Sequence, residues 1–146
     1  MQSRSSQTAA FLIIGAAALA AAPAFADITD DEKAAKRAKV CAQADERYAE
    51  LFPGTKDDGT VIVKLYKYHF CPGDLTVKTG TTVRWVNVDK RTSHSVWLKE
   101  SKINESERFF PEEQWEFSFQ ASGNYPYLCG PHWENEGMLG SVTVTE

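Results

Sequence analysis

From residue 59 to its end, the chain consists of short runs of β-branched and aromatic residues separated by turn signals. The runs are residues 61–68, 75–78, 81–88, 94–98, 115–119 and 140–144. Gly, Pro, Asp and Asn gather between them, at 57–59, 72–74, 79–80 and 122–124. Many short strands at close spacing are typical of a sandwich or barrel. The pattern predicts one all-β domain over residues 59–146.

The preceding segment predicts a single amphipathic helix. Residues 29–52 are rich in Ala, Lys, Glu and Asp and contain no Gly or Pro. Thr29 and Glu32 have the spacing of a capping box, and Pro53-Gly54 ends the helix. The apolar residues fall on one face at helical spacing: Val40, Cys41, Ala44, Tyr48, Leu51 and Phe52. We interpret this face as a packing surface, with residues 27–58 forming a helix and linker before the β domain.

Residues 1–26 have the pattern of a signal peptide. Arg4 precedes an uncharged apolar run over 9–22, and Ala24-Phe25-Ala26 is a small-x-small cleavage site. The run is shorter than the roughly 20 residues that span a bilayer. We therefore expect cleavage after Ala26 and a periplasmic location, with an uncleaved membrane anchor as the alternative.

The net charge of the mature chain limits the classes of macromolecule that it can bind. Removal of residues 1–26 takes away Arg4 alone among the charged residues, which leaves 15 cations and 20 anions, a net charge of 15 − 20 = −5. Nucleic-acid binding requires a basic surface, so we exclude that class. No other long apolar run follows, which predicts a mature protein that is not embedded in a membrane; we expect a monomer.

One short loop collects three soft donor side chains. The segment 127–140, YLCGPHWENEGMLG, contains Cys129, His132 and Met138, although the whole chain has only three Cys, three His and two Met. A thiolate, an imidazole and a thioether together favour copper over hard cations. Structural zinc sites usually offer four strong ligands, often with paired Cys-x2-Cys, and no such pair exists here.

A fourth donor must come from elsewhere in the chain, and His69 and His94 are the remaining imidazoles. His94 follows a predicted strand after a short polar turn, at a loop–strand junction that suits a ligand. His69 lies within a predicted strand, where a histidine is more often satisfied by hydrogen bonds. We therefore favour His94.

The sequence resembles the cupredoxins over about residues 60–146. Residues 70–87, FCPGDLTVKTGTTVRWVN, are similar to their F-x-P…G-x-x-V-x-W-x-N stretch, and the loop at 127–142 resembles the ligand loop of plastocyanin and pseudoazurin. The resemblance implies a Greek-key β-sandwich or barrel, here with an added N-terminal α-helix. It also implies one type 1 copper ion, with His94, Cys129 and His132 as equatorial ligands and Met138 as the axial ligand.

The same resemblance implies a function. Such a protein is not an enzyme but carries single electrons between redox partners such as cytochromes or oxidoreductases, and His132 would be the surface port for the electron. Two alternatives remain open: a copper carrier or chaperone without electron transfer, and an open red-copper-like site that uses Glu134 or Glu136.

Two departures from the family pattern concern the ligand loop. Five residues separate His132 from Met138, one more than in plastocyanin, which could shift the axial distance. Ser95 stands after the first histidine, where many relatives have Asn, so the hydrogen bond that usually ties the loops together is in question.

In an exported protein with three cysteines, one cysteine remains unpaired if the other two form a disulfide. If Cys129 binds metal, Cys41 and Cys71 are available to each other, and we hypothesise a disulfide that ties the helix to the barrel. Two buried free thiols are the alternative.

Overall fold

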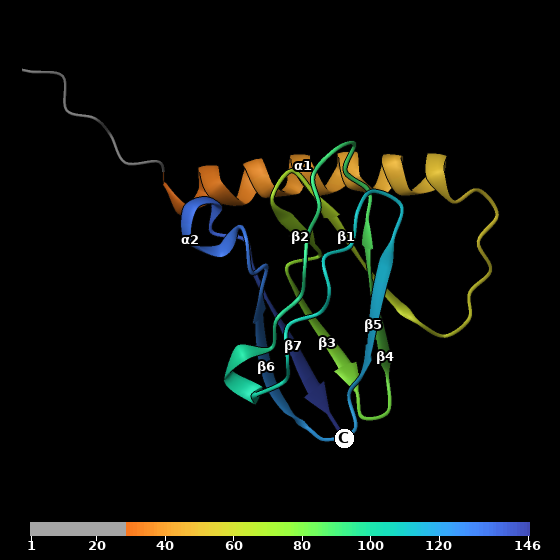
Figure 1. The fold of residues 1–146 in the computed structure, drawn as a ribbon, viewed down its shortest axis with the longest axis vertical. Coiled ribbons are helices and arrows are strands. Elements are labelled where there is room, and N and C mark those ends of the chain that lie inside the picture. Colours follow the sequence, from red (N-terminus) through yellow and green to blue (C-terminus); the bar gives the residue numbers. More distant parts are fainter. Residues whose placement is uncertain (1–28) are drawn as a thin grey trace, which may run out of the picture.

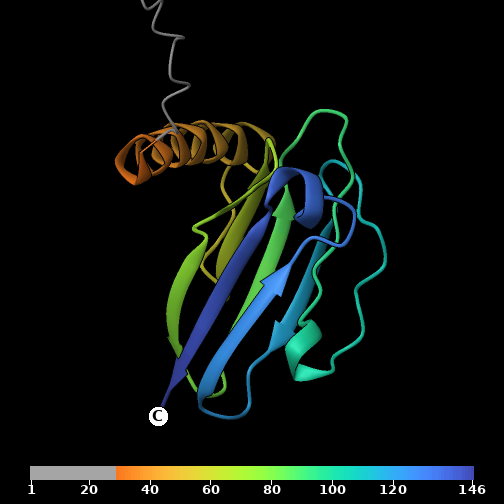
Figure 2. The same cartoon turned by 90° about the vertical axis from the view of Figure 1, so that its left-hand side faces the viewer.

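The structure, a computed structural model, describes residues 29–146. The predicted signal peptide, residues 1–26, lies outside this range. Two sheets pack face to face, and a long helix crosses one end of them (Figures 1 and 2). This arrangement confirms the predicted β-sandwich with an added N-terminal helix. Within 29–146, no helix combines the length and the apolar character that crossing a bilayer requires.

The first sheet has the strand order β2-β1-β4-β5 and the second has the order β3-β7-β6. The strands are β1 (Val61–Tyr66), β2 (His69–Cys71), β3 (Asp74–Lys78), β4 (Thr82–Asn87), β5 (Gln114–Ser118), β6 (Gly123–Leu128) and β7 (Leu139–Thr145). β1 pairs with β4 and β3 with β7 in parallel, while the remaining pairs are antiparallel. Buried side chains from both sheets belong to one hydrophobic cluster, so the inner faces of the sheets form one core.

That core is aromatic at its centre. The Trp85 side chain is fully buried, with its ring 5.3 Å from the ring of Tyr127 and 6.4 Å from that of Phe119. Cys129 and Met138 belong to the same buried cluster. The predicted metal-binding loop is therefore anchored in the hydrophobic core of the domain.

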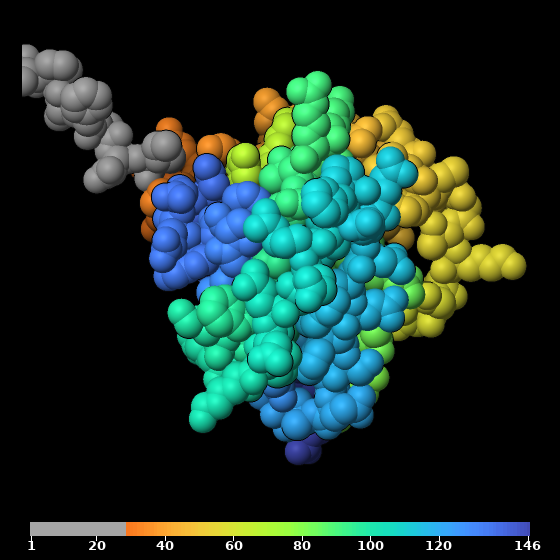
Figure 3. Space-filling model, viewed as in Figure 1, coloured from red at the N-terminus to blue at the C-terminus, as the bar shows by residue number. Residues whose placement is uncertain are grey.

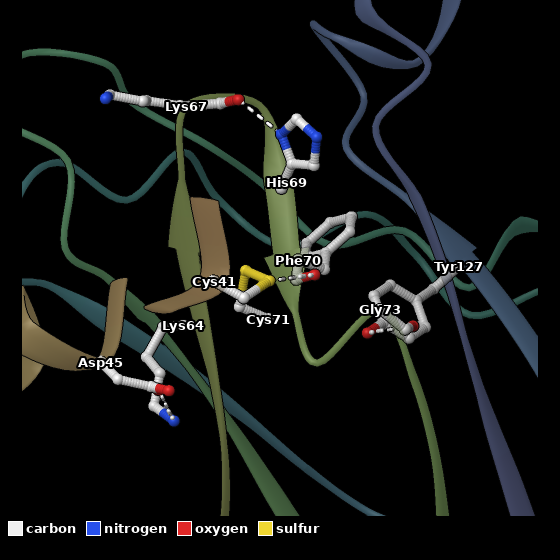
Figure 4. Close-up of a disulfide and its surroundings, with 9 residues drawn as sticks. All are labelled: Cys41, Asp45, Lys64, Lys67, His69, Phe70, Cys71, Gly73 and Tyr127. Atoms are coloured by element: carbon white, nitrogen blue, oxygen red, sulfur yellow. Dashed lines mark hydrogen bonds and ion pairs between the residues drawn. A yellow bond between two sulfur atoms is a disulfide. The ribbon is translucent and has the colours of Figure 1, made fainter. Parts of the chain in front are cut away.

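Helix α1 (Asp30–Leu51) begins at the predicted capping box, in which Thr29 and Glu32 bond each other reciprocally. The predicted apolar face packs in a second cluster, against Tyr66, Val86 and Val88. Cys41 forms a disulfide with Cys71, which confirms the hypothesised link between the helix and the barrel (Figure 4). One turn along the helix, Asp45 pairs with Lys64 of β1 at 2.8 Å.

Two sequence predictions about strands are wrong. Residues 94–98 make no regular strand, because the segment forms single bridges to two different neighbours, His94 to Phe109 and Trp97 to Leu128. The short helix η1 (Lys99–Ser101) follows it. Strand β6 was not predicted because it opens with a turn-like Gly-Asn pair and contains Pro126. Since β6 is an edge strand of its sheet, a residue without an N–H is tolerated there.

The predicted strand 61–68 also ends early. Lys67 and Tyr68 have φ angles of 47° and 62°, so they form a tight turn between β1 and β2. This turn, the loop after β4 and the short helix α2 (Trp133–Glu136) all lie at the end of the sandwich that α1 crosses (Figure 1).

Candidate metal centre

Two loops at the α1 end of the sandwich carry the predicted ligands, one between β4 and β5 and one between β6 and β7. His94 lies in the loop after β4, and Cys129 directly follows β6. His132 is the residue before α2, and Met138 directly precedes β7. Because β4, β6 and β7 are held by the two sheets, their ends fix the two loops relative to each other.

The structure brings three of the predicted ligands together. One ligand atom each of His94, Cys129 and His132 lies within 4.8 Å of the others. The Cys129 Sγ is 3.7 Å from Nδ1 of His94 and 3.3 Å from Nδ1 of His132. Donors about 2.0–2.3 Å from one ion in a trigonal arrangement lie about 3.5–4 Å apart. This group of donors therefore fits one soft metal ion such as copper.

Met138 is buried beside this group. Its backbone C=O accepts the Cys129 N–H at 3.1 Å, and its own N–H points to the His132 carbonyl at 3.3 Å. The long spacer folds into the single turn of α2, which closes at Gly137 with a φ of 63°. A side chain at Gly137 would strain that left-handed position. The extra residue is thus absorbed in the turn, and Met138 stays next to Cys129.

The orientation of His94 is set by Asp89. The His94 side chain is fully buried, and its Nε2 lies 2.9 Å from Oδ2 of Asp89, which leaves Nδ1 facing the Cys129 sulfur. The same Asp89 oxygen accepts the backbone N–H of Lys67 in the β1–β2 turn at 3.1 Å. Carboxylates in this position fix the tautomer of a ligand histidine and raise its basicity.

Cys129 is buried, and burial raises the pKa of its thiol. The backbone N–H of Ser95 points at the sulfur from 3.5 Å and acts in the opposite direction, because a donor stabilises the thiolate. A metal cation would supply the larger stabilisation, since it binds the thiolate form.

His132 is half-buried, unlike His94. Burial lowers the pKa of its imidazole, and the neighbouring His94 adds to this effect. A lowered pKa keeps the ring neutral near pH 7, as a metal ligand must be. The Tyr68 ring, 37% exposed, stands edge-on to the His132 ring with the centroids 4.9 Å apart.

Ser95 ties the ligand loops together despite the departure from the family pattern. Its Oγ accepts the Gly130 N–H at 3.1 Å and donates to Glu105 at 2.5 Å. The Glu105 carboxylate lies where a side chain on Gly130 would have to be placed, so Gly130 is needed for this close approach. The questioned hydrogen bond therefore exists, with a serine and a glutamate providing it.

Other predicted candidates lie apart from the centre. His69 points its Nδ1 at the Lys67 carbonyl, 2.7 Å away, and is not in the group of converging ligand atoms (Figure 4). Glu134 and Glu136 are exposed and are also absent from that group. Sequence reasoning missed Asp89 and Tyr68. A carboxylate five residues before a ligand histidine was a usable signal for Asp89, whereas nothing in the sequence indicates Tyr68.

Comparison with known proteins agrees with this geometry. Residues 58–145 match the model of a family described as copper-binding proteins of the plastocyanin/azurin family. Plastocyanin from Scenedesmus fuscus is 32% identical over 85 residues, which cover 51% of this chain and 85% of that protein. Amicyanin from Paracoccus versutus is 31% identical over 88 residues, which cover 58% of this chain and 64% of that protein. An amicyanin variant solved in its Cu(I) form superposes with a TM-score of 0.53 at 28% identity, covering 60% of this chain and 84% of that one.

Proposed function

The chain belongs to the plastocyanin/azurin family of copper-binding proteins, and on that premise we propose that it is an exported carrier of single electrons. The copper ligands in this proposal are His94, Cys129 and His132, with Met138 as the axial ligand. The observation that carries it is the convergence of a buried thiol and two imidazole Nδ1 atoms within 4.8 Å. Copper bound there would supply the one-electron Cu(II)/Cu(I) couple.

Each protein group then has a physical task. The Asp89 carboxylate holds the His94 ring with Nδ1 toward the sulfur. The Ser95 N–H donates to the Cys129 sulfur and moderates its negative charge. Burial of Cys129 and Met138 excludes water from the centre. Because these groups are fixed by the core and by the loop hydrogen bonds, little rearrangement is needed when an electron arrives or leaves.

His132 is the proposed electron port. It is the less buried of the two imidazoles, and the Tyr68 ring packs against it. A redox protein such as a cytochrome or an oxidoreductase would dock over the surface formed by His132 and Tyr68. The proposal includes secretion directed by residues 1–26, the domain boundaries 27–58 and 59–146, a monomeric state and no catalysis by this protein itself.

A competition experiment separates this function from that of a copper chaperone. The copper-loaded protein is reduced and reoxidised by one electron in two parallel samples. In one sample a chelator specific for Cu(I) competes for the metal, and in the other a chelator specific for Cu(II) does. An electron carrier keeps its copper in both states and cycles reversibly. Rapid transfer of Cu(I) from the protein to the chelator would overturn the proposal and indicate a copper-delivery function.

A further inference from the structure

The N-terminal half of helix α1 carries a cluster of positive charge. Within seven residues it carries the cations Lys33, Lys36, Arg37 and Lys39, all exposed. The helix lies outside the residues that match the family model, 58–145, and is fastened to the barrel by the Cys41–Cys71 disulfide. The cations are therefore held in a fixed position on the surface of an otherwise acidic protein, whose formal net charge is −4.

These cations are mostly not neutralised locally. Among the ion pairs of residues 29–146, only Lys33 takes part, in an exposed contact with Asp30 at 3.3 Å. The anions of α1 flank this cluster: Asp30, Asp31 and Glu32 form the first turn directly before it, and Asp45, after it, pairs with Lys64. Lys36, Arg37 and Lys39 have no ion pair in the same part of the chain.

The basic segment borders an open groove that reaches the ligand loop. The groove has a volume of about 550 Å³ and is lined by Lys33, Ala34, Lys36, Arg37, His69, Asp74, Glu136 and Gly137. Three cations against two carboxylates give its lining a net charge of 3 − 2 = +1 with His69 neutral. In Figure 3 the orange surface of α1 adjoins the blue surface of the ligand loop.

The groove also adjoins the electron port. Glu136 and Gly137 belong to the loop between His132 and Met138. His69 follows Tyr68, whose ring contacts the His132 ring at 4.9 Å between centroids. A partner seated in the groove would thus lie beside the half-buried imidazole of His132.

We propose that this groove docks an acidic surface patch of the protein that exchanges electrons with the copper site, an inference that rests on the proposed function. Lys33, Lys36 and Arg37 attract the partner's carboxylates, and Asp74 and Glu136 restrict the orientation in which it can bind. Charges of this kind act chiefly on the rate of encounter and on the choice of partner. The acidic remainder of the molecule repels the same partner, which confines productive encounters to the α1 side.

The test compares two variants with equal changes in charge. The groove variant is Lys33→Glu/Lys36→Glu. The control is Lys78→Glu/Lys102→Glu: Lys78 pairs with Thr145 near the C-terminus, at the end of the sandwich opposite α1 (Figure 1), and Lys102 follows η1. The probes are cytochrome c and the same cytochrome with its lysines succinylated, which reverses its charge but keeps its haem. Stopped-flow absorbance gives the second-order rate constants.

With the succinylated cytochrome at low ionic strength, we expect the groove variant to react at least five-fold more slowly than the control variant. The difference should vanish at about 0.5 M salt, where the Debye length falls to a few ångströms. The unmodified cytochrome should show no slowing in the groove variant. Equal rates for the two variants with the succinylated probe would overturn the docking proposal.

Two further readouts keep the conclusions separate. If the copper-loaded wild-type protein exchanges electrons with neither cytochrome, the proposed function itself fails. Binding to phosphatidylglycerol vesicles that is lost in the groove variant, with unchanged cytochrome rates, would assign the groove to a membrane surface and overturn the inference.

Discussion

At the scale of single residues, the centre depends on groups that do not touch the metal in our proposal. Asp89 is only 8% exposed, and its carboxylate is shared between the His94 ring and the β1–β2 turn. Its backbone N–H is bonded by the side chain of Asn87, which in turn donates to the Thr92 carbonyl. A negative charge is therefore held rigidly behind one ligand, on the side away from Cys129.

Replacing Asp89 by Asn should raise the reduction potential of the copper protein. Removing a negative charge destabilises Cu(II) more than Cu(I), and an effective dielectric near 20 gives a shift on the order of 100 mV. Protein-film voltammetry measures it, with Asp45→Asn on exposed α1 as the control. An unchanged or lowered potential in Asp89→Asn would show that this carboxylate does not act on the metal.

At the scale of elements, helix α1 and the 52–60 linker are attached to the sandwich by separate contacts. The disulfide and the Asp45–Lys64 pair hold the helix. Asp58 in the linker contacts Arg84 of β4 at 2.8 Å, and Arg84 also contacts Glu116 of β5. None of the four proposed ligands lies on α1 or in this linker, so attachment and metal binding should be separable.

Cys41→Ser/Cys71→Ser should destabilise the fold without removing the copper site. The bridge closes a loop of 30 residues, for which the chain-entropy account gives about 3–4 kcal/mol. Thermal unfolding of the metal-free variant measures the loss, and its visible spectrum with Cu(II) checks the site. Loss of the copper spectrum in a variant that remains folded would contradict this separation.

The Asp58 contacts should respond to acid in a defined direction. Hydrogen bonds from Thr60 and Arg84 lower the pKa of Asp58 to about 2. Because the folded pKa lies below the unfolded one, the contribution to stability is complete above about pH 5 and is lost as the pH falls from about 4 toward 2. Unfolding temperatures of wild type and Asp58→Asn should therefore differ at neutral pH and converge in acid. A difference that does not change with pH would contradict this account.

At the scale of the whole molecule, most of the fold and part of the metal centre could be predicted from the sequence. Features that depend on local spacing could be predicted: the helix cap at Thr29, the apolar face of α1 and most of the strands with alternating residues. Strand β6 was hidden because its Pro126 is acceptable only at a sheet edge, and edges are a property of topology. Asp89 and Tyr68 were missed for a similar reason: their importance comes from the β1–β2 turn folding over the loop after β4.

The central claim is that Cys129 binds copper as a thiolate between two imidazoles. The most direct test is the visible and electron paramagnetic resonance spectrum of the protein with one equivalent of Cu(II), recorded for the wild type and for Cys129→Ser. We predict an intense blue band with a small copper hyperfine splitting in the wild type, and neither feature in the variant. A pale wild-type spectrum with ordinary splitting, or a blue band that survives in Cys129→Ser, would contradict the claim.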